Sequence, residues 1–230
     1  MEMPLRLPSH WLASSRAAGK RPGEARGFRQ TILSYTRLEV PSVERYEAVV
    51  SFDPTHADPL AAHEALSRTF GGRAGEAFLF RADSESAGRY WVYSPEPWRK
   101  APVDAISALA PKRHVLQLAE GLPYRFTLEA CVGRESVVNG AKHVEPFSSV
   151  AHVEAWLPHA APRFGFKPDF FNVALRTLEV PYEGRVLRIG YVAIEGVMHI
   201  SDETLIRPAL LRGIGSHRRV GLGLLQIAAG

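Results

Sequence analysis

The order of strands and helices predicted for residues 44–118 is the feature that most restricts what this chain can fold into. Residues 44–52 (ERYEAVVSF) alternate apolar and polar side chains, which is typical of a half-buried strand. Residues 58–70 (DPLAAHEALSRTF) begin with a capping aspartate and a proline and carry a periodic apolar face, which indicates a helix. The remaining elements are a short helix at 103–109 and strands at 77–81, 90–93 and 113–118. This β-α-β-β-α-β order predicts a ferredoxin-like unit.

The second half of the chain repeats this order more loosely. Its predicted elements are a strand at 124–131, a helix at 148–159, strands at 174–180 and 186–200, a helix at 204–212 and a strand at 222–228. The two middle strands are joined at Glu183-Gly184, which suits a tight hairpin turn. We therefore expect an α+β protein with two tandem ferredoxin-like (RRM-like) units, residues 44–121 and 122–230, the second of which carries a C-terminal Gly-rich loop.

Length and composition set further limits. With 230 residues, 46% of them hydrophobic, the chain can bury one large core or two small ones. No apolar run approaches the roughly 20 residues of a membrane span, and the N-terminus lacks the apolar segment of a secretory signal, so we expect a cytoplasmic protein. The single cysteine, Cys131, is expected to be a buried small hydrophobic residue. No His, Cys, Asp and Glu grouping has metal-ligand spacing, so we expect no metal and no other cofactor.

Residues 1–43 carry the positive charge of the chain. They hold seven basic and three acidic side chains, which accounts for the whole formal net charge of +4. The segment is rich in Gly, Ser and Pro and has little apolar periodicity, so it has no predicted fold of its own. Two interpretations remain: a solvated tail, or a basic arm that binds nucleic acid with help from its aromatic residues. The candidate RNA contacts in such an arm are Arg16, Lys20, Arg21, Arg26 and Arg29.

A second basic segment lies at residues 133–147, between the first strand and the helix of the second unit. It contains Arg134, Lys142 and His143 beside Gly140 and has the pattern of a projecting hairpin rather than of core structure. We expect these three side chains to be further RNA contacts.

The Gly-rich loop, residues 213–223 (GIGSHRRVGLG), has two Gly-x-Gly pairs that bracket a His-Arg-Arg triplet. Glycine permits positive φ and close approach of the backbone to a ligand, so this pattern predicts an anion-binding loop, with a Gly-rich turn and solvated arginines as the alternative. Because a helix precedes the loop and a strand follows it, the pattern is not that of a nucleotide-binding fold. We expect a larger residue at Gly215 to weaken ligand binding and leave folding intact. The candidate contacts are Gly213, Gly215, Ser216, His217, Gly221 and Gly223, with Arg218 and Arg219 as stabilisers of phosphate charge.

A further pattern is spread over several segments: DPLAAHEAL at 58–66, AFLFR at 77–81, EGV at 195–197, ISD at 200–202, and LRGIG with GLGLL across 211–225. Together these segments resemble CRISPR repeat-processing endoribonucleases of the CasE type, in the RAMP superfamily. The resemblance covers about residues 44–230 and implies two RRM-like domains that bind a CRISPR repeat stem-loop. It also implies metal-independent cleavage of precursor crRNA by 2′-hydroxyl attack, with the product kept in an effector complex beside other CRISPR proteins. The arm at residues 1–43 has no counterpart in the usual family member.

His63 matches the position of the family's catalytic histidine, which would act as general base or acid. Family members often carry a tyrosine three residues earlier, where this chain has Leu60. An ordinary half-buried helix histidine is one alternative. Another is an active site made mainly of arginines, with Arg218, Arg219 and an arginine of the arm, which would work by electrostatics and by aligning the 2′-oxygen. Such a divergent site would fit a type IV CRISPR branch as well as type I-E.

Two other functions remain open on the sequence. The aromatic strand at residues 90–93 (YWVY) would suit a non-catalytic RRM-like RNA-binding protein, in which exposed sheet aromatics stack on bases. An enzyme acting on a phosphorylated metabolite is supported by the Gly-rich loop alone.

Overall fold

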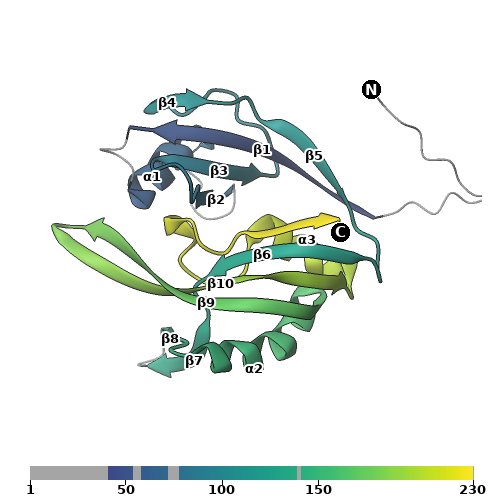
Figure 1. Ribbon diagram of the computed structural model, residues 1–230. Coiled ribbons are helices and arrows are strands. Elements are labelled where there is room, and N and C mark those ends of the chain that lie inside the picture. Colours follow the sequence, from purple (N-terminus) through teal and green to yellow (C-terminus); the bar gives the residue numbers. More distant parts are fainter. Residues whose placement is uncertain (1–40, 54–57, 72–77, 139–140, 230) are drawn as a thin grey trace, which may run out of the picture. The chain divides into compact units, whose positions relative to one another are not determined.

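The computed structural model describes residues 41–53, 58–71, 78–138 and 141–229 (Figure 1). All of them belong to one compact body within residues 39–230. The candidate RNA contacts of the basic arm, Arg16, Lys20, Arg21, Arg26 and Arg29, lie outside the described residues.

The first ferredoxin-like unit consists of one helix and an antiparallel sheet. Its elements are β1 (Ser42–Phe52), α1 (Pro59–Thr69), β2 (Leu79–Ala82), β3 (Arg89–Ser94), β4 (Ala105–Ala108) and β5 (Lys112–Gln117). Strand β1 pairs with β3 on one side and with β4 and β5 on the other, and β2 forms the edge beyond β3. The chain turns into α1 where predicted, because the Asp58 side chain caps the helix by accepting from Leu60 N at 2.9 Å.

The prediction of a helix at residues 103–109 is wrong, because the structure places β4 there. Val103, Ile106 and Leu109 have helical spacing, but they are 90%, 66% and 60% exposed and meet no core that would favour a helix. The backbone pairs with β1 instead, and Leu109 N donates to Val49 O at 2.9 Å. The second helix of the β-α-β-β-α-β pattern is therefore replaced by a strand in this unit.

The second ferredoxin-like unit has the predicted order of elements and a long hairpin. The described elements are β6 (Pro123–Ala130), β7 (Gly133–Val138), β8 (Ala141–Pro146), α2 (Val150–Ala160), η2 (Ala161–Phe164), β9 (Phe166–Tyr182), β10 (Arg185–Ile200), α3 (Glu203–Arg212), η3 (Arg218–Val220) and β11 (Leu225–Ala229). The sheet order is β11-β6-β10-β9, and β7 pairs with β8 as the expected projecting hairpin. Glu183 and Gly184 both have positive φ, as a two-residue hairpin turn requires. The predicted α+β fold of two tandem ferredoxin-like units is confirmed.

Each sheet buries one face against its own helices. In β6 the alternate residues Tyr124, Phe126 and Leu128 face a core that α2 and α3 complete (Figure 1). In the first unit, β1 and β3 pack against α1, with Tyr90 and Leu66 in the same cluster. The predicted burial of Cys131 is confirmed, since that side chain is 1% exposed. Among the described helices, none is both long enough and apolar enough to cross a membrane.

The second face of the first sheet packs against the second unit. Tyr93 and Trp91 of β3 form a cluster with Leu79 and with Leu224, which directly precedes β11. Gln226 of β11 donates its side-chain amide to the Tyr93 hydroxyl. Tyr90 and Tyr93 are only 2% and 5% exposed, so the aromatic strand that would support a non-catalytic RRM-like protein is part of the core.

Gly196 of β10 gives a test of the contact between the two long strands. A Cβ at Gly196 would lie 2.2 Å from the carbonyl oxygen of Phe170 on β9, so Gly196→Ala should lower the free energy of unfolding by about 1–3 kcal/mol. Gly190→Ala on the same strand is the matched control, because its Cβ would meet Pro146 at an ordinary 3.6 Å. Urea unfolding measures both variants, and equal losses would contradict the predicted close approach.

Candidate functional site

The Gly-rich loop is bound by its backbone to the end of β6. Gly223 N donates to Glu129 O at 2.6 Å, and Ser216 N donates to Cys131 O at 3.2 Å. The loop also closes on itself, because Ile214 N donates to Gly223 O at 2.8 Å. These hydrogen bonds hold both ends of the loop and its middle, so its polar side chains project from a fixed backbone.

The glycines of the loop are required by this backbone. Gly215 has φ +86°, and a Cβ there would lie 2.7 Å from Cys131 O; Gly223 has φ +95°, and its Cβ would lie 2.8 Å from Ile214 O. The expectation that a larger residue at Gly215 would leave folding intact is therefore wrong. Gly213 and Gly221 also have positive φ, and Gly221 and Gly223 are buried. Gly213, Gly215, Ser216 and His217 are the accessible part of the predicted backbone cradle.

The short helix η3 presents the basic triplet. Val220 and Leu222 are buried with Cys131 in an apolar cluster, which anchors the loop between the two units. His217, directly before η3, adopts a left-handed conformation with φ 62° and ψ 33°. His217 and Arg219 are exposed, whereas Arg218 is half-buried.

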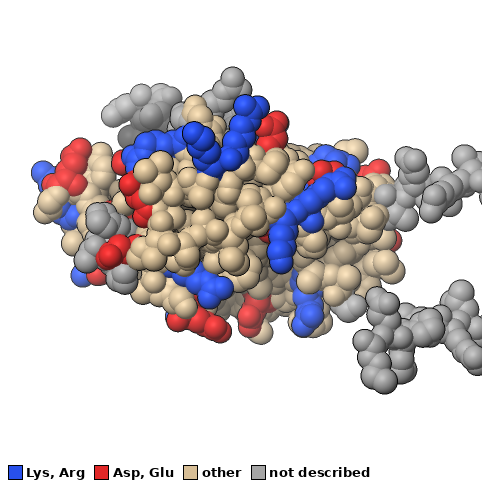
Figure 2. Space-filling view, turned by 90° about the horizontal axis from the view of Figure 1, so that it is seen from above, with Lys and Arg blue, Asp and Glu red and all other residues tan. Residues whose placement is uncertain are grey.

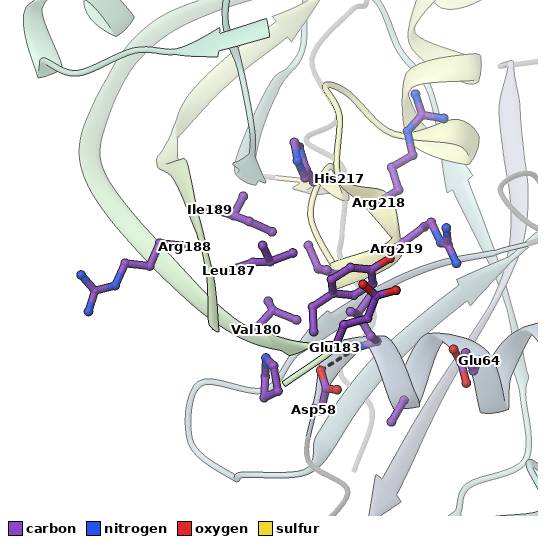
Figure 3. Close-up of a pocket in the computed structure, with 15 residues that line it drawn as sticks. Asp58, Glu64, Val180, Glu183, Leu187, Arg188, Ile189, His217, Arg218 and Arg219 are labelled. Atoms are coloured by element: carbon purple, nitrogen blue, oxygen red, sulfur yellow. Dashed lines mark hydrogen bonds between the residues drawn. The ribbon is translucent and has the colours of Figure 1, made fainter. Parts of the chain in front are cut away.

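A cavity of about 890 Å³ lies beside this helix (Figure 3). Its walls come from η3, from the start of α1 and from the tip of the β9–β10 hairpin. The apolar wall includes Leu60, Val180, Leu187 and Ile189. The titratable and charged residues around it are Asp58, Tyr182, Glu64, Glu183, Arg188, His217, Arg218 and Arg219. The sequence did not predict that β9 and β10 contribute to this cavity. The alternating pattern of the two strands does not indicate where the end of their hairpin lies in the fold.

The two arginines of the triplet point in different directions (Figure 3). Arg219 extends over α1, and its positive charge acts on His63 of that helix. Arg218 extends toward α3 and also lines a second cavity with Arg163 and Arg212. The structure thus brings Arg219 to the α1 side of the loop, whereas His217 lies on the side of Ile189 (Figure 3), and Arg218 is shared between two cavities.

His63 lies in the core of the first unit beneath the loop. Its side chain is 5% exposed, and its ring centroid lies 5.5 Å from that of Phe78 and 6.0 Å from that of Phe80. The pKa of His63 is lowered, chiefly because burial disfavours the imidazolium and also because of the positive charge of Arg219. His63 is not among the described residues that line the large cavity. Its predicted catalytic role stays a prediction.

The basic hairpin meets the other side of the Gly-rich loop. Glu135 and Val144 of the hairpin line a cavity of about 610 Å³ together with Trp156, Gly215 and Ser216. Arg134 is exposed and stands opposite Glu145 in the hairpin register. The side chains of Lys142 and His143 lie outside the description. The loop therefore separates two cavities, one toward the hairpin and one toward α1.

The surface over the first sheet has mixed charge. Figure 2 shows basic and acidic side chains interspersed on that face. The exposed ion pairs of the first unit include Arg113 with Glu44 and Arg68 with Asp104. Since phosphate binding needs an excess of positive charge, this face is a weaker candidate for RNA than the Gly-rich loop. Within the described ranges, no group of three or more His, Cys, Asp or Glu side chains is placed to hold a metal ion.

Comparison with known protein families gives one match over most of the chain. A family model described as CRISPR associated protein matches residues 33–229. No curated protein matches the sequence significantly. The fold is similar to that of the CRISPR endoribonuclease Cse3 bound to a 19-nucleotide RNA, with a TM-score of 0.67 and 22% identity over 81% of this chain and 100% of that chain.

Two further solved structures are similar over the same extent. Cse3 of Thermus thermophilus, bound to an RNA that represents a pre-cleavage complex, has a TM-score of 0.66 and 23% identity over 81% of this chain and 100% of that chain. Cas6e of Escherichia coli K-12 has a TM-score of 0.61 and 21% identity over 81% of this chain and 100% of that chain. The shared fold spans the whole length of these relatives.

The burial of His63 predicts a pH dependence of stability. Because its pKa in the folded protein lies below the value of about 6.5 in an unfolded chain, the unfolded state binds a proton more readily. The stability that the neutral imidazole contributes is therefore complete above about pH 6.5 and is lost as the pH falls toward the lowered pKa. In urea unfolding, the stability of the wild type relative to His63→Leu should decrease over this acidic range. A difference that does not change with pH would contradict the buried neutral imidazole.

Proposed function

The chain belongs to the family of CRISPR-associated proteins, and from this premise we propose that it is an endoribonuclease that processes CRISPR precursor RNA. The substrate is a repeat stem-loop, and the ribose 2′-hydroxyl next to the scissile phosphate is the nucleophile. The reaction needs no metal ion. The mature crRNA stays bound to the protein within an effector complex that contains other CRISPR proteins.

One observation carries this proposal: the Gly-rich loop holds basic side chains at a cavity beside α1, in a fold that solved structures of Cse3 share while bound to RNA. The loop backbone is bound to β6, so the points from which its arginine side chains project are fixed before a substrate arrives. A positive charge that is already in place stabilises the transition state more than one that must be reoriented during the reaction. The site therefore suits a reaction in which negative charge builds up on a phosphate.

Arg219 has the better placement of the two arginines for this role. It is exposed, it lies on the α1 side of the loop and it lines the large cavity. In-line attack of the 2′-oxygen places additional negative charge on the non-bridging phosphate oxygens, which a guanidinium can hold through two hydrogen bonds. Arg218 would contact the RNA backbone on the α3 side of the same loop.

The remaining basic residues extend the RNA contact. We assign the arm at residues 1–43 and the hairpin side chains Arg134, Lys142 and His143 to phosphate binding, since each group adds positive charge outside the loop. Residues 44–121 and 122–230 are the two RNA-binding units of this proposal. Phosphate contacts of this kind determine the affinity for RNA and its dependence on salt. The residues that act in the chemical step belong to the Gly-rich loop.

Cleavage of a repeat RNA in EDTA tests the proposed function. The wild type should cut the RNA at one site in the presence of EDTA, and a single 2′-deoxy substitution at the scissile nucleotide should abolish the cut while binding persists. The reason is that the 2′-oxygen is the nucleophile and no metal-bound water replaces it. Gel analysis of end-labelled RNA measures both. If the wild-type protein leaves the unmodified repeat RNA intact, the protein is an RNA-binding protein without nuclease activity. Cleavage of the deoxy substrate would exclude the proposed mechanism.

Arg219→Ala tests the electrostatic part of the site. We expect the single-turnover rate at saturating enzyme to fall by roughly 10²–10³-fold, because charge that stabilises the transition state is lost. The slope of log affinity against log salt should also decrease by about one unit if the side chain contacts one phosphate.

Arg188→Ala is the matched control for this variant. Arg188 stands at the rim of the same cavity, points away from it and pairs with Glu179 at 3.0 Å. Its removal should leave the rate within a few-fold of the wild type. Equal rate losses in the two variants would show that Arg219 acts only as general positive charge.

A further inference from the structure

We propose that a cavity on the sheet of the second ferredoxin-like unit binds a guanine base. The cavity lies between that sheet and β2 of the first unit, and its volume of about 310 Å³ is at the lower end of the range of ligand sites. It shares no lining residue with the cavity beside η3, so it is separate from the site proposed for cleavage. Three features support a base as its ligand: the shape of the floor, the charges around it and one buried nitrogen atom.

The floor of the cavity is hollow because two small side chains lie next to each other on the sheet. Ala193 of β10 pairs with Ala174 of β9, and both line the cavity. The surrounding positions carry longer polar side chains. Glu129 of β6 is the other partner of Ala193. Glu195 and Asn172 form the next pair along the same face of the sheet. A flat ring can therefore lie on the two alanines with polar groups around its edge.

The charged groups around this hollow are not neutralised by ion pairs. The charged residues that line the cavity are Arg81, Arg176, Glu129 and Glu195. None of these four forms an ion pair with another described residue. Two positive and two negative side chains make this cavity unlike the basic Gly-rich loop, and the carboxylates would repel a phosphate group. A neutral ring that has both hydrogen-bond donors and acceptors fits such a lining better than a phosphate does.

Arg81 lacks part of the hydrogen bonding that a buried arginine needs. Its Nε atom is buried and has no hydrogen-bond partner among the described residues. Because nearly all buried polar atoms of folded proteins have a partner, this exception requires an explanation. The guanidinium group has further N–H groups that can bind an acceptor. A ligand with acceptor atoms would supply the partner that the fold does not provide.

Guanine is the base whose edges match this arrangement. Its O6 and N7 atoms are two acceptors that one guanidinium can bind together. Its N1–H and N2 amino groups are adjacent donors, which the two oxygens of one carboxylate can accept together. Adenine and cytosine offer only their exocyclic amino group to a carboxylate, and uracil offers only N3–H. Guanine therefore makes two paired contacts in a cavity that presents an arginine and a glutamate.

Arg81 and Glu129 are the residues that we assign to these two contacts. Glu129 is half-buried, and its backbone is fixed because Glu129 O accepts from Gly223 N at 2.6 Å. Arg81 is half-buried as well, whereas Arg176 and Glu195 are exposed. Partly buried charged groups form stronger hydrogen bonds than fully solvated ones, because the local dielectric constant is lower. The assigned pair should therefore contribute most of the preference for guanine.

A guanine base can reach the cavity from two sources. One is an unpaired guanosine of the repeat RNA outside the stem, because the base edges of an unpaired nucleotide are free. The other is free guanosine. The first source rests on the proposed function, and it would add recognition of a base to the phosphate contacts, which carry no sequence information.

A ligand-observed NMR titration with guanosine tests the cavity without any RNA. We expect guanosine to bind Arg81→Met and Glu129→Gln roughly tenfold to hundredfold more weakly than the wild type, because each change removes one paired contact. Adenosine should bind the wild type more weakly than guanosine does. Arg125→Met is the matched control, since Arg125 lies on the same face of β6, is exposed and is not among the described residues that line the cavity. This control should bind guanosine like the wild type.

Urea unfolding separates a role of Arg81 in ligand binding from a role in stability. Arg81→Met removes a buried N–H group that has no acceptor and keeps most of the side-chain length. Its unfolding midpoint should therefore be at least as high as that of the wild type. A midpoint well below that of Arg125→Met would show that Arg81 holds the fold together, and it would contradict the assignment of Arg81 to a ligand.

Repeat RNA with inosine in place of single unpaired guanosines identifies the source of the base. Inosine keeps O6 and N7 but lacks the N2 amino group. One such substitution should weaken binding to the wild type and leave binding to Glu129→Gln unchanged, because the lost contact is the one to the carboxylate. If every substituted RNA binds like the unmodified RNA while guanosine still binds the protein, the cavity takes the free nucleoside.

Two results would overturn the base site. The first is a wild-type protein that binds guanosine no better than adenosine. The second is an Arg125→Met protein that loses as much affinity for guanosine as Arg81→Met does. Neither result depends on cleavage. If the wild type leaves repeat RNA intact in EDTA, the proposed function fails, but selective binding of guanosine would still support the cavity as a base site.

Discussion

The hydrogen bonds between the Gly-rich loop and the end of β6 are the interaction on which the rest of the site depends. Gly223 N and Ser216 N each donate to a carbonyl oxygen of the Glu129–Cys131 segment. They determine where η3 lies, and therefore where His217 and Arg219 project. The positive φ angles of the loop glycines are the structural requirement for this contact, because a Cβ at Gly215 or Gly223 would strike a backbone oxygen. The glycines are therefore required first for the folded conformation of the loop. That conformation then determines which loop groups can contact RNA.

The same loop also joins the two ferredoxin-like units. It leads into Leu224, which packs against Tyr93 of the first sheet, and then into β11, which completes the second sheet. The cavity beside η3 has walls from α1 in the first unit and from β9 and β10 in the second. Because no single element forms the site, its geometry depends on how the two units pack, and a change at either side should alter it. This arrangement leaves the first sheet without a free face for base stacking, unlike an isolated RRM.

Much of the fold followed from local patterns, and the failures have physical causes. The alternation of β1, the Asp58 cap and the Glu183-Gly184 turn are local signals, and the structure has all three. Residues 103–109 have the apolar spacing of a helix, but pairing with β1 overrides that spacing. The sequence predicted His63 and the basic triplet as site residues, and the structure places the triplet, but not His63, on the cavity beside η3. The sequence did not show that His63 would be enclosed by Phe78 and Phe80, or that β9 and β10 would form a wall of the cavity, since both depend on tertiary packing.

The central claim is that this fold cuts RNA with the 2′-oxygen of the substrate, guided by the side chains of one rigid loop. The most direct measurement is mass spectrometry of the two fragments that the wild type produces from its repeat RNA. A 5′ fragment that ends in a 2′,3′-cyclic phosphate and a 3′ fragment that begins with a 5′-hydroxyl are predicted, because the nucleophile belongs to the RNA itself. A 3′-hydroxyl together with a 5′-phosphate would mean that water attacked the phosphorus, and it would contradict this account.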